Sequence, residues 1–505
     1  MEKTVFQIDS IFQDHMILQR EKQIAVWGTG KPGEVVTVAV QGQRFAGEIR
    51  EDGSWQVLLS GLKASLGETV TVACGQEERI FSDVAVGEVW LAGGQSNMEF
   101  QLCFEKYWDE ECVCPPNENL RFYDVPEIAY AGQDQDFDYS KMGIWRKTTS
   151  EDLKYFSAVG YYFQKKLQAE LNVPVGIVGC NWGGTTSSEW MSRDSVERLD
   201  NYWWQRFLSQ SEGIDWEEFY RKQKDSMMND RGNVMDSEFT KTFLPRTYSE
   251  EEGWQLLSRM PKPDFMALTP EKVPGALYEH MVKKTAPFGI RGVLWYQGES
   301  DDEAPDRSVY EDMLKALIAD WRALWEDETL PFLIVQLPGW DRWLFTQNEE
   351  YSVIRRCQEA VTRQDENAWL CSISDAGEQY DIHPKNKKVV GERLALLAEG
   401  HVYGKDILCD APCLKDIRRD GTRCYLAFSN ADGGLTVDGD TVNSLRVVQN
   451  GTELDYSFEL DGDTLILDFE GEAGPVSIHF ADEKWFAVNL YNRMRIPAIP
   501  FTEGI

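Results

Sequence analysis

Positive charge is scarce in this sequence. Its 505 residues include 51 Lys and Arg against 85 Asp and Glu, which gives a formal net charge of −34 at pH 7. Such a chain repels phosphate backbones and anionic membrane surfaces, so neither nucleic acid nor a membrane is expected as a partner. Better candidates are small ligands that are neutral, or that are attracted by charges close to the binding site.

Long hydrophobic runs are also missing. No stretch of about 18 uncharged apolar residues occurs, which argues against a membrane-spanning helix. Residues 1–12 mix charged and apolar side chains and lack the continuous apolar segment of a signal peptide, so we expect a cytoplasmic protein.

Cysteine is sparse as well. Ten cysteines scattered over the chain are typical of reduced thiols rather than of a disulfide framework. Cys112 with Cys114, and Cys409 with Cys413, have spacings that could hold a metal, but no second Cys/His pair lies nearby in sequence. We therefore expect ordinary thiols, no metal site and no cofactor.

The residues that are present predict a folded protein of several structural units. Hydrophobic residues make up 42% of the chain and aromatic residues 12%, which is typical of globular proteins. Turn signals and hydrophobic periodicity predict an N-terminal β-domain at 1–85, a catalytic domain in two parts at 86–194 and 286–405, an insertion or cap at 195–285, and a C-terminal β-domain at 406–505.

Strands alternate with helices in both parts of the predicted catalytic domain. Strand patterns occur at 89–91, 173–179, 290–296, 332–337 and 369–374, and helical patterns occur at 150–171, around 313–324, at 350–363 and just after 384. This alternation predicts the α/β fold class, with a parallel sheet covered by helices on both faces.

The first loop expected to carry chemistry follows the strand pattern at 89–91. Ligands of open α/β sheets bind at the carboxyl ends of the strands, so the loops after strands are the places to search. Here Gly93 and Gly94 allow a sharp turn that leaves the Ser96 hydroxyl at the sheet edge, with the Ser96 N–H free to face an oxyanion. Met98 stands where the second glycine of a nucleophile elbow would be, so this is not the α/β-hydrolase motif.

Two further loops offer hydrogen-bond donors. In the loop 181–186, Gly183 and Gly184 can present backbone N–H groups that no side chain obstructs. In the loop 295–301, Gln297 carries a side-chain amide that can donate to an oxyanion.

A fourth loop, 380–384, offers a general base. Of the five histidines, only His383 follows a predicted sheet strand, and Asp381 lies two residues before it. A serine hydroxyl is a weak nucleophile that needs an adjacent base, and the base needs a group that orients it. Ser96, His383 and Asp381 can fill these three roles.

Several sequence blocks are similar to a known family. The segments 87–91 with 94–98, 182–185, 295–300 and 381–384 resemble the sialate O-acetylesterase family of SGNH hydrolases, and so do the segments 16–20, 26–28, 274–278 and 489–492 with 497–498. The resemblance covers nearly the whole chain apart from the middle insertion.

This resemblance implies a flavodoxin-like α/β/α core of three layers and a set of site residues. It implies Ser96 as nucleophile, His383 as base, Gly184 or Gly183 together with Gln297 as oxyanion donors, and Gln95 and Glu299 among the oxyanion and substrate-binding residues. In SGNH hydrolases the acid usually lies three residues before the histidine, where this chain has Tyr380. Asp381 is therefore the expected third member, with Asp375 and Asp301 as alternatives.

The function expected from these residues is hydrolysis of acetyl esters on a mono- or oligosaccharide. The resemblance implies sialate 9-O-acetyl esters, while the acidic chain favours neutral acetylated xylo- or manno-oligosaccharides. Two other classes stay open: a catalytically silent carbohydrate-binding protein, and a glycosidase that pairs Glu299 with another acid. The sequence leaves the oligomeric state open, a homo-oligomer included.

Overall fold

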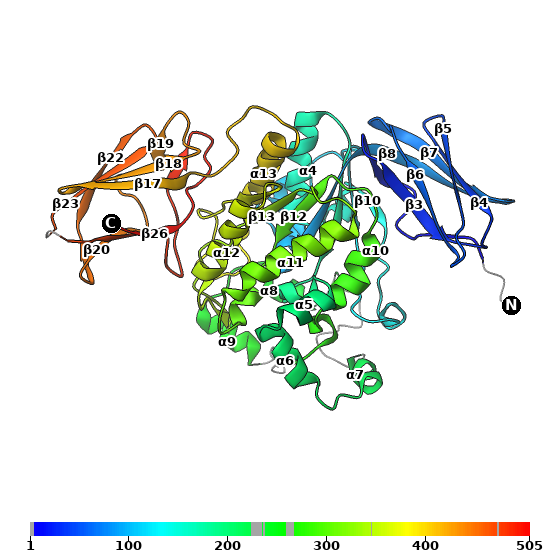
Figure 1. Ribbon diagram of the computed structural model, residues 1–505, viewed down its shortest axis with the longest axis horizontal. Coiled ribbons are helices and arrows are strands. Elements are labelled where there is room, and N and C mark those ends of the chain that lie inside the picture. Colours follow the sequence, from blue (N-terminus) through cyan, green and yellow to red (C-terminus); the bar gives the residue numbers. More distant parts are fainter. Residues whose placement is uncertain (1–4, 224–234, 236–237, 259–266, 345, 472–473) are drawn as a thin grey trace.

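The computed structural model describes residues 5–223, 235, 238–258, 267–344, 346–471 and 474–505. Residues 224–234, 236–237 and 259–266 of the predicted insertion lie outside the described residues, as do residues 1–4 of the predicted N-terminal β-domain and 472–473 of the predicted C-terminal one. Figure 1 shows the N-terminal strands (blue) at one end of the molecule, the C-terminal strands (orange and red) at the other, and a sheet with helices between them.

A mostly parallel sheet forms the centre of the protein. Its strands have the order β10-β9-β11-β8-β12-β13-β16, and each neighbouring pair except β10 with β9 runs parallel. The bounds are β8 (Glu77–Gly94), β9 (Leu120–Asp124), β10 (Trp145–Lys147), β11 (Val175–Asn181), β12 (Gly292–Tyr296), β13 (Phe332–Val335) and β16 (Ala368–Cys371). Most residues of these strands are buried, because both faces are covered.

Helices pack on the two faces of this sheet. Trp90 of β8 contacts Phe163 of α4 (Ala158–Leu171), with ring centroids 5.1 Å apart. Gly93, which points to the opposite face because it lies three residues further along the strand, faces Trp321 of α11 (Val309–Leu324). Helix α13 (Lys388–Leu397) packs against α4, and α12 (Tyr351–Gln364) packs against α11. The predicted α/β fold is confirmed.

Two predicted elements differ from the structure. The strand predicted at 89–91 is the end of β8, which begins at Glu77 and runs from the N-terminal strands into the central sheet, so the predicted boundary at 85 falls inside one strand. The single helix predicted at 150–171 is α3 (Ser150–Leu153) followed by α4. The break occurs because the Ser157 hydroxyl accepts the Gly160 N–H (3.1 Å) as an N-cap and starts a new helix.

The segment predicted as an insertion is helical where the structure describes it, and no described residue between 195 and 285 is in a strand. It contains the end of α5 (Arg193–Leu199), α6 (Tyr202–Ser211), α7 (Trp216–Gln223), α8 (Glu238–Phe243), α9 (Glu250–Leu257) and α10 (Lys283–Thr285). Figure 1 shows most of these helices (green) on the lower side of the molecule.

The remaining strands belong mainly to the two ends. The N-terminal ones are β1 (Gln7–Ile8), β2 (Ile17–Gln19), β3 (Ile24–Thr29), β4 (Val35–Val40), β5 (Gln43–Glu48), β6 (Ser54–Leu59) and β7 (Ser65–Cys74). The C-terminal ones are β17 (Cys413–Asp420), β18 (Arg423–Ser429), β19 (Leu435–Val437), β20 (Leu445–Gln449), β21 (Thr452–Leu454), β22 (Tyr456–Asp461), β23 (Thr464–Phe469), β24 (Ser477–Phe480), β25 (Leu490–Asn492) and β26 (Phe501–Gly504). The C-terminal strands enclose a hydrophobic cluster of their own.

Short elements near the site are α1 (Ser96–Glu99), α2 (Trp108–Glu111), β14 (Arg342–Trp343) and β15 (Thr346–Gln347).

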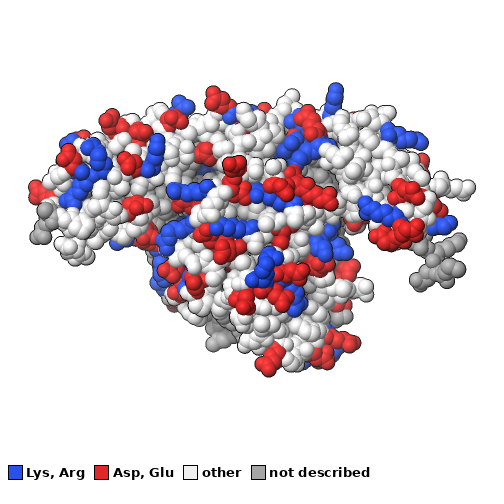
Figure 2. Space-filling view, in the orientation of Figure 1, with Lys and Arg blue, Asp and Glu red and all other residues white. Residues whose placement is uncertain are grey.

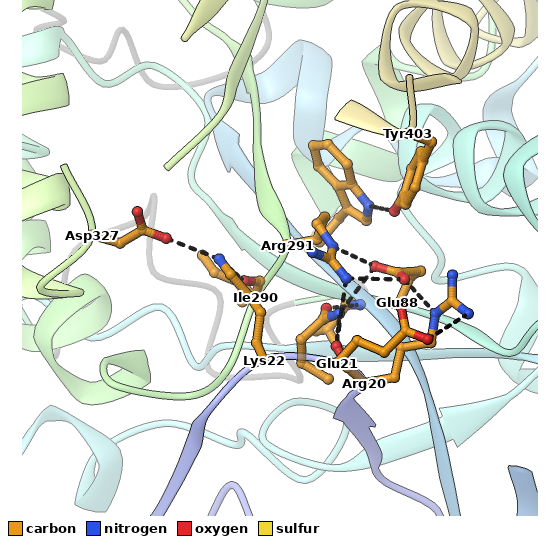
Figure 3. Close-up of polar contacts among 11 residues, drawn as sticks. Arg20, Glu21, Lys22, Glu88, Ile290, Arg291, Asp327 and Tyr403 are labelled. Carbon is orange, nitrogen blue, oxygen red and sulfur yellow. Dashed lines mark hydrogen bonds and ion pairs between the residues drawn. The ribbon is translucent and has the colours of Figure 1, made fainter. Parts of the chain in front are cut away.

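A buried ion-pair cluster joins the N-terminal strands to the central sheet (Figure 3). The Glu88 side chain on β8 is fully buried and accepts hydrogen bonds from Arg20 Nε (2.6 Å), Arg291 Nε (2.8 Å) and Gln19 Nε2 (3.0 Å). Burial alone would raise the pKa of Glu88, but the bonds and charges of Arg291 and Arg20 outweigh it and lower that pKa. The carboxylate is therefore charged in the folded protein.

Replacing Glu88 with leucine should destabilise the protein by about 3–5 kcal/mol, because two largely buried guanidinium groups lose their partner. Urea unfolding measures this change. Glu21→Ala is the control, since the Glu21 side chain is 62% exposed and 3.7 Å from Arg20 and should contribute less than about 1 kcal/mol. Equal effects of the two substitutions would contradict the prediction. In the wild type, the stability that Glu88 contributes is present above its ordinary pKa of 4.5 and is lost as the pH falls through its lowered pKa.

Candidate active site

Ser96 lies at the carboxyl end of the central strand β8, at the start of α1. Gly94 makes this turn: its φ is +139°, and a Cβ there would lie 2.1 Å from the carbonyl oxygen of Tyr296, so only glycine fits between the two strands. The Met98 and Glu99 N–H groups donate to the Gln95 carbonyl. Within the described part of the chain the Ser96 N–H makes no hydrogen bond, as is usual for the first residue of a helix.

His383 lies within hydrogen-bond reach of Ser96. The distance from His383 Nε2 to Ser96 Oγ is 2.9 Å, and the imidazole is 5% exposed beside the edge of the Trp343 ring, with centroids 4.7 Å apart. Burial, followed by the charges of Lys385 and Lys387, lowers the pKa of His383 well below 6.5. The imidazole is therefore neutral at neutral pH, the state in which it can accept a proton from serine.

Asp381 lies beside His383 without a hydrogen bond to its ring. Asp381 Oδ1 is 3.7 Å from His383 Nδ1 and accepts the His383 backbone N–H (2.8 Å) instead. Its other oxygen pairs with Lys385 Nζ (2.8 Å) and accepts the Thr247 hydroxyl (3.2 Å) from the segment between α8 and α9. Among the described residues, His383 Nδ1 has no hydrogen-bond partner.

The two alternative candidates for the triad acid, Asp375 and Asp301, bond to groups other than His383. Asp375 forms a two-pronged ion pair with Arg393 (2.6 and 2.8 Å). Asp301 accepts from the Ser187 N–H and hydroxyl (2.9 and 2.7 Å) and from Gln297 Nε2 (2.6 Å). Asp381 is thus the carboxylate that the structure brings closest to the imidazole of these three.

We expect Asp381→Asn to lower kcat only about 10- to 100-fold, because the carboxylate acts on the imidazolium through charge at 3.7 Å and not through a hydrogen bond that fixes the tautomer. Steady-state kinetics on 4-nitrophenyl acetate measures this effect. Asp375→Asn is the matched control, since its carboxylate pairs with Arg393, and its kcat should change less. A loss of 10⁴-fold or more for Asp381→Asn, on the order seen when a triad acid fixes its histidine, would contradict this geometry.

The predicted oxyanion donors are only partly free. The Gly183 N–H donates to Glu99 Oε2 (2.7 Å), whereas the Gly184 N–H makes no hydrogen bond within the described residues. Gly184 has a φ of +75°, which glycine adopts without strain. The Gln297 amide is fully buried and donates to Asp301 Oδ2 (2.6 Å), with the Gln95 side chain and the Thr185 carbonyl as further acceptors at 3.2 and 3.3 Å. The structure thus leaves the Ser96 and Gly184 N–H groups free and engages those of Gly183 and Gln297.

Gln95 and Glu299 hold loops together. Gln95 Oε1 accepts from Gln297 Nε2 and from the Gly298 and Ser300 N–H groups, at 3.2 to 3.4 Å. Glu299 Oε1 accepts from Asn97 Nδ2 (2.6 Å). Both side chains are buried, 3% and 6% exposed, because they fill the space between the loops that follow β8 and β12.

Glu99 of the Ser96 motif and two acidic groups that its charge affects, Asp124 and Glu127, are not expected from the sequence. Burial raises the pKa of Glu99 to about 7, and its hydrogen bond from Gly183 offsets part of this rise. Burial also raises the pKa of Asp124 to about 7, and burial with the charges of Glu99 and Asp124 raises the pKa of Glu127 well above its ordinary value. Glu99 could have been found from the sequence, because it belongs to the same motif as Ser96. Thr247, which contacts Asp381, and Trp343, which contacts the His383 ring, have no such sequence signal.

A pocket borders the second loop of the site. It is lined by Gly184, by Trp203, Arg206 and Phe207 of α6, and by Leu268 and Glu303. The aromatic walls therefore come from the helical segment that the sequence predicts as an insertion, and they meet a glycine of the candidate oxyanion loop.

The cysteines with metal-like spacings lie in different surroundings. The Cys112 and Cys114 thiols donate to the backbone carbonyls of Asp109 and Glu110. Cys409 lies beside His401 and Asp410, and the His401 Nε2 is 2.9 Å from the Asp410 carboxylate. Cys413 contacts Glu359 and Arg363 instead. No helix among the described residues combines the length and the apolar character needed to cross a bilayer.

The chain is similar to known carbohydrate esterases. The family model described as "Carbohydrate esterase, sialic acid-specific acetylesterase" matches residues 266–397, which include His383 but not Ser96. The sialate O-acetylesterase of Mus musculus is 27% identical over 477 residues, 86% of this chain and 79% of the mouse protein. The sialate O-acetylesterase of Homo sapiens is 25% identical over 442 residues, 81% of this chain and 73% of the human protein.

A solved structure has the same fold over the full length. The crystal structure of a carbohydrate acetylesterase from Xanthomonas citri is 27% identical, with a TM-score of 0.77 that covers 99% of both chains. The mixed α/β fold and these matches define the protein as a carbohydrate esterase. The chain is similar over most of its length to the sialate O-acetylesterases.

Proposed function

We propose that this enzyme removes O-acetyl groups from sugars through an acetyl-enzyme, with Ser96 as nucleophile and His383 as general base. The observation that carries the proposal is the 2.9 Å contact between Ser96 Oγ and the buried, neutral His383 Nε2. Ser96 attacks the acetyl carbonyl while His383 takes the hydroxyl proton, and the Ser96 and Gly184 N–H groups donate to the oxyanion.

His383 gives the proton to the sugar oxygen as the bond between the acetyl carbon and that oxygen breaks, which leaves the acetyl-enzyme. In the second half of the reaction His383 takes a proton from a water molecule that attacks the acetyl carbon, and returns this proton to Ser96 Oγ as the ester bond to Ser96 breaks. Acetic acid leaves and ionises to acetate. Asp381, 3.7 Å from Nδ1, stabilises the imidazolium that forms in each half.

We also infer that the central sheet and its helices form an SGNH-type core of three layers, built from residues 86–194 and 286–405. The support is positional: Ser96 follows β8, the glycine loop follows β11, and His383 lies after β16, all at the carboxyl ends of parallel strands.

The sugar is proposed to approach Ser96 from the side of Gly184, which borders a small pocket lined by Trp203 and Phe207 of α6. Proteins with sialate O-acetylesterase in their name are among the relatives of this chain, which supports a sialate ester as substrate.

A neutral acetylated oligosaccharide is a second candidate, favoured by charge. In addition to burial, the charge of Glu99 raises the pKa of Asp124, and the charges of Glu99 and Asp124 raise the pKa of Glu127, so an anionic sugar near these groups would add to the same repulsion. The chain carries a net charge of −34, and on the face in Figure 2 the Lys and Arg side chains are interspersed with Asp and Glu. No extended basic patch that would draw in a carboxylate is visible on that face.

Measuring acetate released from O-acetylated sialic acid and from acetylated xylo- and manno-oligosaccharides tests the function and separates the two substrates. Acetate from either class supports an acetylesterase, and the larger kcat/KM identifies the preferred sugar. Reducing sugar without acetate would indicate a glycosidase instead, and glycan binding without turnover would indicate a silent binding protein; either result would overturn the proposal.

A further inference from the structure

Asn97 occupies an unusual position in the site. It directly follows Ser96 and is 1% exposed. Its Nδ2 donates to the carbonyl oxygen of Ile382 (2.9 Å), the residue directly before His383. One side chain adjoining the nucleophile therefore holds the backbone adjoining the base.

Charged groups on both sides fix the Asn97 amide. Its Nδ2 also donates to Glu299 Oε1 (2.6 Å), and its Oδ1 accepts from Lys387 Nζ at short range. Lys387 Nζ donates to the oxygen, while Glu299 Oε1 and the Ile382 carbonyl oxygen accept from the nitrogen, so these contacts favour this orientation of the amide over the flipped one.

Lys387 is a buried lysine that takes no step in the proposed reaction. Its side chain is fully buried above the rings of Phe100 and Tyr296, with Nζ 4.9 and 5.5 Å from the ring centroids. Burial, and then the charge of Lys385, lowers the pKa of Lys387 to about 7. Placing a lysine here is costly, so its contact with Asn97 must compensate for the lost hydration.

Glu299 completes the set from the loop after β12. It is 6% exposed, and burial raises its pKa to about 7. Its second oxygen, Oε2, has no hydrogen-bond partner in the described residues, so the contact with Asn97 is the principal one that orients this carboxylate. Three loops thus converge on a single amide.

We propose that Asn97, clamped between Lys387 and Glu299, is a positioning residue that fixes the distance between Ser96 Oγ and His383 Nε2. The inference rests on the proposed roles of Ser96 and His383. It explains why a buried lysine and a buried glutamate lie on either side of an amide beneath the site: the pair holds the loop of the base against the loop of the nucleophile.

The main test is Asn97→Ala, which removes the bond to the His383 loop without touching substrate. A displacement of the base by about 1 Å costs on the order of 10²-fold in rate, so kcat on 4-nitrophenyl acetate should fall about that far while KM changes less than about threefold. The rate at which a fluorophosphonate probe labels Ser96 should fall in parallel, because that reaction needs the same base. A variant that merely lost stability would show unchanged labelling per folded molecule, and this would overturn the proposal.

A second pair of variants keeps the test decisive if Asn97→Ala does not fold. Glu299→Gln retains an oxygen that can accept from Asn97 and should lose less than about tenfold in kcat, whereas Glu299→Leu should approach the loss of Asn97→Ala. Equal kcat for the two Glu299 variants would overturn the proposal. Lys388→Met is the matched control for a charge on the same helix: Lys388 packs on the Tyr107 ring outside this set, and its kcat should stay at the wild-type level.

Ser96→Ala separates failure of this inference from failure of the proposed function. If Ser96→Ala is inactive and unlabelled while Asn97→Ala keeps wild-type kcat and labelling, the positioning role is wrong and the proposed function stands. If Ser96→Ala keeps its activity, the proposed function is wrong and the positioning role falls with it.

Discussion

Replacing Ser96 with alanine should lower kcat on 4-nitrophenyl acetate by on the order of 10⁴-fold or more, because no other hydroxyl is paired with His383 in the described residues. The remaining rate would come from the Ser96 and Gly184 N–H groups and from substrate binding. Mass spectrometry of the wild type, quenched during turnover, should show one added acetyl group on the peptide that contains Ser96. Retained activity in Ser96→Ala would refute the acetyl-enzyme mechanism.

Ser300→Ala is a suitable control for this prediction. The Ser300 hydroxyl accepts from Gln95 Nε2 at 3.3 Å in the neighbouring loop, so the variant loses a hydroxyl close to the site without losing the contact to His383. Its kcat should stay within about tenfold of the wild type, and a thermal melt should show that both variants are folded. If kcat fell equally in Ser300→Ala and Ser96→Ala, removal of either hydroxyl would disturb the site, and the loss in Ser96→Ala would not identify Ser96 as the nucleophile.

The sequence predicts where the site lies because the argument depends only on strand direction. Parallel strands end at the same edge of a sheet, so loops that follow strands must gather there, whatever their side chains do. Ser96, Gly184 and His383 follow β8, β11 and β16, and the structure brings Ser96 and His383 to 2.9 Å. Their catalytic roles stay a prediction until the variants are measured.

The sequence cannot predict which amides are free, since that depends on the direction of each side chain. The motif around Ser96 presents three polar side chains at alternate positions: Gln95 bonds the loop after β12, Asn97 bonds the His383 loop and Glu99 bonds the Gly183 N–H. Gln297 is expected to donate to the oxyanion, and in the structure its buried amide donates to Asp301 Oδ2 at 2.6 Å. Hydrogen-bond competition among buried groups decides this, and spacing alone does not reveal it.

The contacts of Asp381 also could not be predicted from spacing alone. A carboxylate two residues before a backbone N–H readily accepts from it in a local turn, and Asp381 Oδ1 does so with the His383 N–H at 2.8 Å. This local bond holds the oxygen 3.7 Å from Nδ1. A spacing of three residues, as in most SGNH hydrolases, would avoid this particular competition. The unusual two-residue spacing therefore did indicate that the Asp381 assignment was the least secure one. The reason is the local turn, in which Asp381 bonds the backbone of His383 and not its ring.

The second large effect is expected at His383. His383→Ala should lower kcat by on the order of 10⁴-fold or more, because Ser96 Oγ then has no base within hydrogen-bond reach among the described residues. Added imidazole should restore part of the rate, since it can enter the space that the ring leaves, whereas it should restore none to Ser96→Ala. Failure of imidazole to discriminate between the two variants would contradict the assignment of His383 as base.

The pH dependence of the wild type gives an independent test of the same base. His383 accepts a proton only when neutral, so kcat/KM should fall as the pH drops through its pKa, and burial with the charges of Lys385 and Lys387 places that pKa well below 6.5. His383 itself is therefore expected to remain an effective base below the pH at which a free imidazole becomes half protonated. Lys385→Met removes one of these positive charges, which should raise the His383 pKa and move the acid limb of kcat/KM to higher pH. A limb that moves the other way, or that stays in place in Lys385→Met, would mean that the group titrating in the free enzyme is not His383.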